Sequence, residues 1–264
     1  MRRIVHISDL HFGREDPAAV EGLVKKICEL RPHLVVVSGD LTQRARSGQF
    51  RQARDFLDRL PVPQLVVPGN HDVPLYNVLD RFAQPLENFK RFISDDLSPI
   101  FADDEIAVAG VNTTRSLTIK GGRITRAGAA ELRRKLDGIV GPQLKIVVTH
   151  HPFDTEEGLG RAPEAMAVFA DCGADLFLSG HLHVSGVTSS THQLELEAGR
   201  SVLLVAAGTA VSVRERGEAN SFNVLDFDPP FLKIETHRAG PDAGGFNHCS
   251  IQRFERVKNG WAAV

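Results

Sequence analysis

The chain has 264 residues, of which 42% are hydrophobic and 24% are charged, and its formal net charge is -2. This composition is typical of an ordinary globular protein, and the length suffices for one α/β domain with a full core. Acidic and basic residues are interleaved along the sequence, which argues against a protein whose main task is to grip long nucleic acid. Nucleotides remain possible ligands.

Cysteine usage and the start of the chain indicate a cytoplasmic protein. Cys28, Cys172 and Cys249 lie far apart and in no metal-binding spacing, as is typical of reduced cysteines in the cytosol. The apolar stretch after Met1 is too short for a signal peptide, and no run approaches about 20 apolar residues. We therefore expect no transmembrane segment.

The first part of the chain predicts three strands, with a helix after each of the first two. Apolar runs predict strands at 4–8, 34–37 and 65–67, and helical spacing of apolar residues predicts helices over 17–30 and 49–60. Polar residues follow each strand: Asp9 and His11, then Asp40, then Gly69-Asn70-His71-Asp72. Because open parallel sheets build their sites at the carboxyl ends of strands, we expect these side chains to lie close together.

The middle and the end of the chain extend this pattern. Large apolar residues predict a mainly helical insertion over 73–105, and further patterns predict strands at 106–111, 145–149 and 176–178 and helices over 126–136 and 163–170. His150-His151-Pro152 and Gly180-His181-Leu182-His183 follow two of these strands. Residues 202–206, 222–227, 231–236 and 251–254 predict strands, with a hairpin at 228–230. We expect this β-rich region to form a second sheet.

Several of the side chains at strand ends are nitrogen or oxygen ligands of the kind that divalent transition metals take: Asp9, His11, Asp40, Asn70, His150, His181 and His183. They are enough for two ions, and one aspartate should bridge, because a carboxylate has two oxygens to share. Two such ions can hold a hydroxide between them, since metal binding lowers the pKa of water from about 15.7 toward about 7. This hydroxide would attack a bound phosphate.

The Gly69-to-Asp72 stretch adds a proton donor to this set. Gly69 lacks a Cβ, which lets the backbone turn sharply at the strand end. His71 follows the ligand Asn70 and can stabilise the charge of the phosphate or protonate the leaving oxygen. Asp72 either orients the His71 imidazole or caps a helix. Taken singly, each of these residues also fits a plain turn or a core histidine.

In order, these motifs resemble those of the calcineurin-like metallophosphoesterases. The resemblance implies an α/β fold, a four-layer αββα sandwich of two mixed β-sheets flanked by helices, with residues 1–264 as a single metallophosphoesterase domain. One ion would be held by Asp9, His11, Asp40 and His183. The other would be held by Asp40, Asn70, His150 and His181. Asp40 would then be the bridge between two divalent ions, which would be Mn²⁺, Fe²⁺/Fe³⁺ or Zn²⁺.

Within this superfamily, the opening Ile7-Ser8-Asp9-Leu10-His11-Phe12 resembles that of the class III cyclic-nucleotide phosphodiesterases. The expected function is hydrolysis of small phosphodiesters, including 3′,5′-cyclic nucleotides to monophosphates. The expected substrate-binding residues are Asn70, His71, His151, Arg14 and Asn112. A diester has two organic arms, so we expect a partly apolar cleft lined by Leu10, Phe12 and Phe153, with Arg14 as the nearest cation in sequence.

Other functions remain open at this stage. A pyrophosphate hydrolase acting on a UDP-2,3-diacylglucosamine-type lipid, as in the lipid A pathway, would use the 73–105 insertion to cover acyl chains. A nuclease is disfavoured by the charge. A non-catalytic interaction scaffold on the same fold, as in the retromer subunit that resembles phosphoesterases, would have no need of a complete ligand set. The insertion or the tail could form a homodimer.

Overall fold

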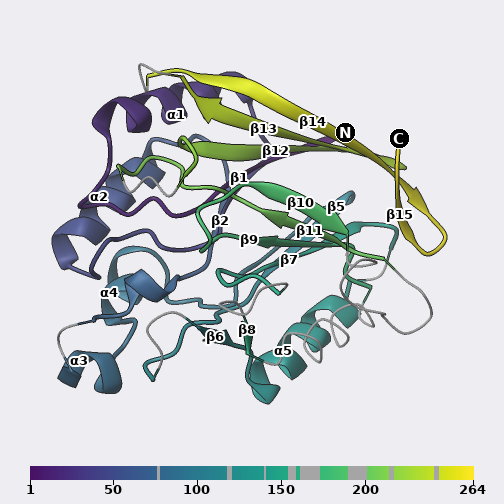
Figure 1. Ribbon diagram of the computed structural model, residues 1–264. Helices are drawn as coiled ribbons and strands as arrows, with labels where there is room; N and C mark the ends of the chain where they lie inside the picture. The colour runs from purple at the N-terminus through teal and green to yellow at the C-terminus, as the bar shows by residue number, and fades with distance from the viewer. Residues whose placement is uncertain are drawn as a thin grey trace.

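Two β-sheets stack face to face, and helices cover their outer faces (Figure 1). This is the four-layer αββα sandwich expected from the sequence. The computed structural model describes residues 1–75, 78–117, 121–139, 141–153, 159–160, 173–189, 201–213, 217–240 and 244–264. The expected short helix over 163–170 lies outside these ranges.

The first sheet has seven strands in the order β15-β14-β13-β12-β1-β2-β3. Its parallel part is β1 (Arg2–Ile7), β2 (Leu34–Val37) and β3 (Gln64–Val66). Its antiparallel part is β12 (Ser221–Asp228), β13 (Phe231–Ala239), β14 (Phe246–Val257) and β15 (Gly260–Ala263). Of the strands expected in the β-rich region, only that at 202–206 belongs to the second sheet, as β11 (Leu203–Ala206). Those from 222 onward extend the first sheet, because β12 pairs with β1, and for them the expectation of a second sheet is wrong.

The second sheet has the order β10-β11-β9-β7-β5-β4. Its strands are β4 (Ile100–Ala102), β5 (Ile106–Gly110), β7 (Leu144–Val148), β9 (Leu176–Ser179), β10 (Gly186–Ser189) and β11 (Leu203–Ala206). The four central strands, β5, β7, β9 and β11, run parallel. A separate short pair joins β6 (Gly122–Arg123) to β8 (Leu159–Gly160).

Two of the helices, α1 (Pro17–Leu30) and α5 (Arg126–Asp137), begin where the sequence supplies a side-chain cap. At the start of α1, the Asp16 side chain accepts hydrogen bonds from the amides of Ala18 and Ala19. Thr125 caps α5 in the same way, and α2 (Ser47–Asp58) lies beside α1. The described residues of the insertion, 73–75 and 78–105, are less helical than expected and form α3 (Val78–Ala83), α4 (Glu87–Phe92) and β4. Pro85 separates the two helices, because proline cannot continue a helix.

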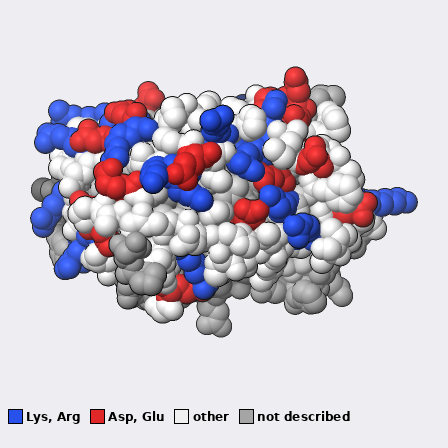
Figure 2. Space-filling view, turned by 90° about the horizontal axis from the view of Figure 1, so that it is seen from above, with Lys and Arg blue, Asp and Glu red and all other residues white. Residues whose placement is uncertain are grey.

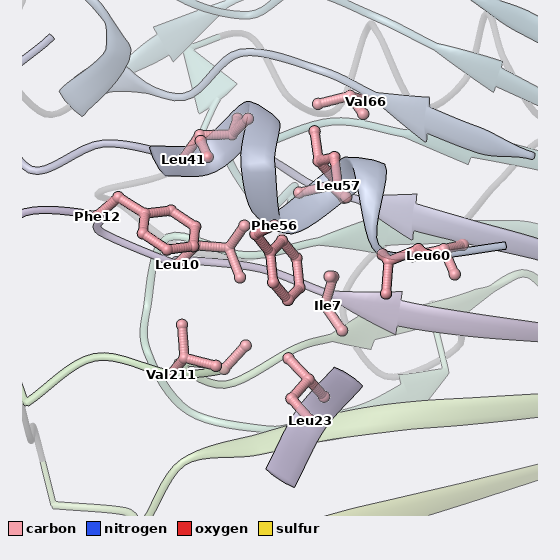
Figure 3. Packing of buried hydrophobic residues seen from close by; sticks show 14 of the residues in the cluster. Ile7, Leu10, Phe12, Leu23, Leu41, Phe56, Leu57, Leu60, Val66 and Val211 are labelled. Atoms are coloured by element: carbon pink, nitrogen blue, oxygen red, sulfur yellow. The ribbon is translucent and has the colours of Figure 1, made fainter. Parts of the chain in front are cut away.

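Apolar side chains fill the three spaces between the four layers. Alternate residues of a strand face opposite sides, so Val5 and Ile7 pack toward α1 and α2 while Ile4 packs between the sheets. Figure 3 shows part of the first space, where Leu23 of α1 and Phe56 of α2 meet Ile7. A third cluster joins α5 to the second sheet through Leu132, Leu136 and Phe177.

The face that carries α1 and the C-terminal strands has no large region of one charge. Figure 2 shows Lys and Arg interspersed with Asp and Glu over this face. Several form ion pairs, such as Arg59 with Glu21 and Arg3 with Asp226. Within the ranges given above, no helix has both the length and the apolar character needed to cross a membrane.

Candidate metal centre

Both sheets deliver polar side chains to one place. The loops after β1, β2 and β3 supply Asp9, His11, Asp40 and Asn70, and the loops after β7 and β9 supply His150, His181 and His183. All except Asn70 are buried. The structure therefore brings together the whole ligand set expected from the sequence, at the carboxyl ends of parallel strands, where such sheets place their sites.

The first group of donor atoms consists of Asp9, His11 and His183. The Nε2 atoms of His11 and His183 are 3.3 Å apart. Asp9 Oδ1 lies 3.2 Å from His183 Nε2 and 3.5 Å from His11 Nε2. Three donor atoms thus surround one point.

The second group consists of Asn70, His150 and His181. Asn70 Oδ1 lies 3.0 Å from His150 Nε2 and 3.0 Å from His181 Nδ1. Asp40 lies between the two groups, because its Oδ1 is 3.3 Å from His150 Nε2 and its Oδ2 is 3.8 Å from His11 Nε2. Each oxygen of Asp40 therefore faces a different group.

These spacings fit divalent cations. Metal-ligand bonds of about 2.1 Å at right angles place neighbouring donors about 3.0 Å apart, close to the separations in both groups. Asp9 Oδ1 is also buried and accepts no hydrogen bond within the described part of the chain. A buried carboxylate oxygen without a donor is costly in a protein and is satisfied by a cation.

Five of these residues have an unusual backbone. The φ angles of Asp9, His11, Asp40, His181 and His183 lie between 50° and 73°, in the left-handed region that residues other than glycine rarely adopt. Such conformations cost of order 1–3 kcal/mol each and persist only where the surrounding structure holds them. Here the strained residues are the candidate ligands, so the fold stores strain where the side chains must converge.

The charges at the centre also suit cations. Burial disfavours the charged form of Asp40, yet His150 and its other neighbours hold the pKa of that carboxyl well below its usual value. Burial likewise opposes the charged form of Asp9, and the neighbouring imidazoles of His11 and His183 hold the pKa of that carboxyl below its usual value. Burial lowers the pKa of His150, but the Asp40 carboxylate outweighs it and raises the pKa to about 9. Two ionised carboxylates thus attract positive charge to a buried place.

The imidazoles are held by partners that the sequence did not reveal. Thr209 Oγ1 lies 2.8 Å from His183 Nδ1, and the Ser38 carbonyl oxygen lies 2.8 Å from His150 Nδ1. Because a carbonyl only accepts, His150 carries its proton on Nδ1, which leaves Nε2 as a donor to a metal. Thr209 follows β11, so a search for polar residues after apolar runs would have found it.

Gly69 is needed for a reason other than the one expected. Its φ of -106° is open to any residue. A Cβ at Gly69, however, would lie 2.1 Å from Asp40 Oδ1. The missing side chain lets the loop after β3 approach the carboxylate, and the His71 amide then donates a 2.8 Å hydrogen bond to the same oxygen. Asp40 is thus fixed by the loop that carries Asn70.

His71 lies at the edge of the centre and is half-buried. Its Nδ1 donates a 2.9 Å hydrogen bond to the Gln43 carbonyl oxygen, which directs Nε2 away from that carbonyl. The ring centroid is 4.9 Å from that of His11. A possible ligand atom of His71 lies within 4.8 Å of those of His11 and Asp40, so geometry alone also permits His71 as a ligand.

The contacts of Asp72 fit a cap, the second of the two roles expected, since its side chain accepts from the Gly69 amide at the start of the helical turn over 70–72. Its buried carboxylate accepts hydrogen bonds from the backbone amides of Leu41, Thr42 and Gly69. Burial raises the pKa of this carboxyl to about 6, and the charge of Asp40 adds to the effect. Asp72 therefore ties the loop after β2 to the loop after β3.

The expected apolar cleft residues are in the core. Leu10, Phe12 and Phe153 are at most 5% exposed. Phe12 packs on Phe56, as Figure 3 shows, and Phe153 packs on Phe177. The expectation that they line a cleft is therefore wrong, because neighbouring helices and strands cover these side chains.

Two hollows instead contain two of the expected substrate residues, Arg14 and Asn112. One, of about 400 Å³, is lined by Gly13, Arg14, Gln43, Arg44, Arg46 and Gln49. It contradicts the expectation of few cations, because Arg44 and Arg46 join Arg14. The other, of about 440 Å³, is lined in part by Asn112, Thr114 and Leu86.

His151 also lies at the centre. It is buried, its Nδ1 is 2.8 Å from Thr113 Oγ1, and its ring centroid is 4.8 Å from that of His181. His151 forms a further group of possible metal ligands with His150 and His181. Asn112 is half-buried, and its side-chain oxygen accepts hydrogen bonds from Thr114.

Comparisons with known proteins agree with this geometry. Over 274 aligned residues the chain is 23% identical to the 3′,5′-cyclic adenosine monophosphate phosphodiesterase CpdA of Escherichia coli, covering 96% of this chain and 92% of that protein. Its fold matches a purple acid phosphatase from yellow lupin (TM-score 0.71, 14% identity, 97% of this chain) and spans 54% of that chain. It also matches a dimetal phosphatase from Danio rerio (TM-score 0.65, 13% identity, 94% and 98% coverage).

A family model describes the sequence features that form the centre. The model of the calcineurin-like phosphoesterases matches residues 2–185, which include every candidate ligand from Asp9 to His183. Members of this family use dinuclear metal centres, and the two donor groups that share Asp40 have the matching form. The chain belongs to the calcineurin-like phosphoesterase family and is a hydrolase.

Proposed function

We propose that this protein is a two-metal phosphodiesterase that hydrolyses small phosphodiesters, including 3′,5′-cyclic nucleotides to nucleoside monophosphates. The observation that carries the proposal is the position of Asp40, with one oxygen toward each donor group. The name of the Escherichia coli relative supports the cyclic-nucleotide part. The metals would be Mn²⁺, iron or Zn²⁺, all of which accept imidazole ligands.

The residues of the centre have distinct tasks in this proposal. Asp9, His11, Asp40 and His183 would hold one cation, and Asp40, Asn70, His150 and His181 would hold the other. Bound cations would supply an activated water and offset the charge of the phosphate. Thr209 and the Ser38 carbonyl keep the imidazoles in their orientation.

His71 would act on the substrate. Its Nδ1 proton is held by Gln43, so Nε2 is the atom that faces the substrate. A proton on Nε2 would stabilise the phosphate charge or pass to the leaving oxygen, which gives the alcohol of the product. Asp72 contributes by holding the loop that carries Asp40 against the loop that carries His71.

The remaining expected substrate residues lie around the centre. His151 would contact the phosphate beside His150, and Asn112 would contact an organic arm in the hollow next to Leu86. Arg14, in the loop after β1, would contact an anionic part of the substrate. We further propose that residues 1–264 form one domain and that the protein is cytoplasmic.

Two of the three phenylalanines in α3 and α4 pack on Phe50, which weakens the lipid alternative, whereas Phe82 of α3 is exposed. The insertion was expected to cover acyl chains with its phenylalanines. Phe89 is instead fully buried against Phe50, and the ring of Phe92 stacks on Phe50 at 6.5 Å between centroids. Replacing Phe89 would therefore test folding more than lipid binding, since large-to-small core changes cost about 3–5 kcal/mol.

A substrate panel tests the proposal. Protein loaded with Mn²⁺ is incubated with 3′,5′-cyclic AMP, a chromogenic diester, a phosphomonoester and a lipid-linked sugar-nucleotide pyrophosphate. We expect faster turnover of the diesters than of the monoester. Efficient cleavage of the lipid pyrophosphate without cleavage of cyclic AMP would instead support the lipid function. Absence of all turnover, with two ions bound, would support a scaffold.

A further inference from the structure

We propose that the hollow lined by Arg14, Arg44 and Arg46 binds a second phosphate group of the phosphodiester substrate. This inference rests on the proposed phosphodiesterase function and extends it, because a cyclic mononucleotide carries only one phosphate. The preferred substrate would then be a diester with an additional terminal phosphate, such as a short 5′-phosphorylated oligonucleotide.

The hollow lies next to the metal centre, because it is lined by residues that follow the candidate ligands closely in sequence. Arg14 follows His11 in a tight turn, in which the Arg14 amide donates a 2.9 Å hydrogen bond to the His11 carbonyl oxygen. On the other side, Gln43 lines the hollow with its side chain while its carbonyl oxygen holds His71. A substrate contacted by His71 therefore has the hollow beside it.

The two loops that form the hollow are joined, which fixes the backbone positions of the arginines. Phe12 pairs with Thr42 as an isolated bridge, and the Gln43 amide donates to the Phe12 carbonyl oxygen at 3.0 Å. Gln49 Oε1 accepts hydrogen bonds from the backbone amides of Arg44 and Arg46. The backbone of the hollow is thus built before any ligand binds, which lowers the cost of binding.

The charges of the hollow favour a phosphate. Arg14 and Arg46 are exposed, and neither forms an ion pair with a described residue. Glu15 is the adjacent acidic residue, and its oxygens already accept hydrogen bonds from the Gly13 amide and the Gln52 side chain. Guanidinium groups match the geometry of phosphate oxygens, and each arginine offers several donors.

Two matched substrates test the proposal. The dinucleotides ApA and pApA contain the same internal diester and differ only in the 5′-phosphate. We expect kcat/KM of the metal-loaded protein to be about 10- to 100-fold higher for pApA, the scale of charged hydrogen bonds. The ratio should fall to near 1 in the variant Arg44→Gln/Arg46→Gln. Arg51→Gln is the control, because Arg51 is exposed on α2 outside the hollow.

The outcomes separate this inference from the function on which it rests. Cleavage of ApA and pApA at equal rates would overturn the inference and leave the phosphodiesterase function in place. If neither is cleaved, turnover of 3′,5′-cyclic AMP and of the chromogenic diester decides whether the phosphodiesterase function holds, and calorimetric titration of pApA and ApA still tests the hollow. Tighter binding of pApA that Arg44→Gln/Arg46→Gln abolishes would support it, and equal binding would overturn it.

A final experiment, with added inorganic phosphate, tests whether the hollow binds the phosphate of the substrate or a free phosphate ion. If inorganic phosphate changes ApA turnover in the wild-type protein but not in Arg44→Gln/Arg46→Gln, and pApA has no advantage, the hollow takes a free anion and our assignment is wrong. Circular dichroism of each variant establishes that it is folded.

Discussion

The metal centre and the arginine hollow share two loops, residues 9–16 and 40–46, yet they differ in burial, backbone conformation and charge. The candidate ligands Asp9, His11 and Asp40 are buried and have left-handed backbones. Arg14 and Arg46, a few residues further along, are exposed side chains on the rim. One short loop thus carries a rigid part inside the protein and an adaptable part outside it.

This difference in burial decides how strongly the metal centre and the arginine hollow each attract a charged ligand. Electrostatic energies are several-fold larger in the buried interior than at the surface, where water and salt screen them. We therefore expect changes at the centre to abolish function and changes at the hollow to alter preference. The following predictions test this comparison, from the largest expected effect to the smallest.

Replacing Asp40 should have the largest effect. Asp40→Asn keeps the size and can still accept the hydrogen bond from the His71 amide, but it removes the charge that faces both donor groups. We expect metal affinity to fall by at least about 100-fold and activity to fall with it. Elemental analysis after dialysis measures the ions per chain. Asp58→Asn, at an exposed place on α2, should retain them. Two tightly held ions in Asp40→Asn would rule out the bridging role.

Replacing His71 should affect the chemistry and leave the ions in place. His71→Ala is expected to lose rate by about 10² to 10⁴-fold, the scale of general acid catalysis. The loss should be smaller for diesters whose leaving group is already a weak base. Steady-state kinetics with two chromogenic diesters measures this, with the exposed His248→Ala as the control. Loss of an ion would make His71 a ligand, and equal losses for both diesters would indicate phosphate positioning.

Replacing Asp72 should destabilise the fold around the centre. Asp72→Ala leaves the buried amides of Leu41, Thr42 and Gly69 without their acceptor, and unpaired buried donors cost about 1–3 kcal/mol each. We expect the free energy of unfolding to fall by about 3 kcal/mol, measured by urea denaturation. Asp96→Ala removes a similar hydrogen bond, to the Ser98 amide, from an exposed turn and should cost far less. Equal losses in both variants would refute the clamp role of Asp72.

Salt should have the smallest effect and should act on the hollow. The screening length falls from about 10 Å at 0.1 M salt to about 3 Å at 1 M salt. We expect the preference for pApA over ApA to decrease several-fold across this range, because Arg14 and Arg46 are exposed. The number of bound ions should stay constant, since the ligands are buried. A preference that does not change with salt would show that the second phosphate binds elsewhere.

Much of the fold follows from local sequence. The helix expected over 17–30 is α1, because Asp16 and Pro17 define its start. The strand expected over 34–37 is β2, because its apolar run is interrupted by Ser38 and Gly39. The polar residues after the strands also pointed to one site, since all parallel strands of a sheet end at the same edge.

Other features needed the folded chain. The pairing of β12 with β1 joins segments more than 200 residues apart, and no local pattern specifies it. The burial of Phe89 and Phe153 depends on which elements lie over them. The sequence suggested Arg14 as the nearest cation, whereas the bridge between Phe12 and Thr42 places Arg44 and Arg46 beside it.

The sequence by itself determined which chemistry this protein can perform, because ligand types and strand periods are local properties. It also determined the order in which Asp9, Asp40, Asn70, His150 and His181 occur. The tertiary structure decided the rest: which loops approach closely enough to share Asp40, which aromatic residues become core, and where cations gather. These features depend on contacts between distant segments, and only packing of the two sheets and their helices fixes those contacts.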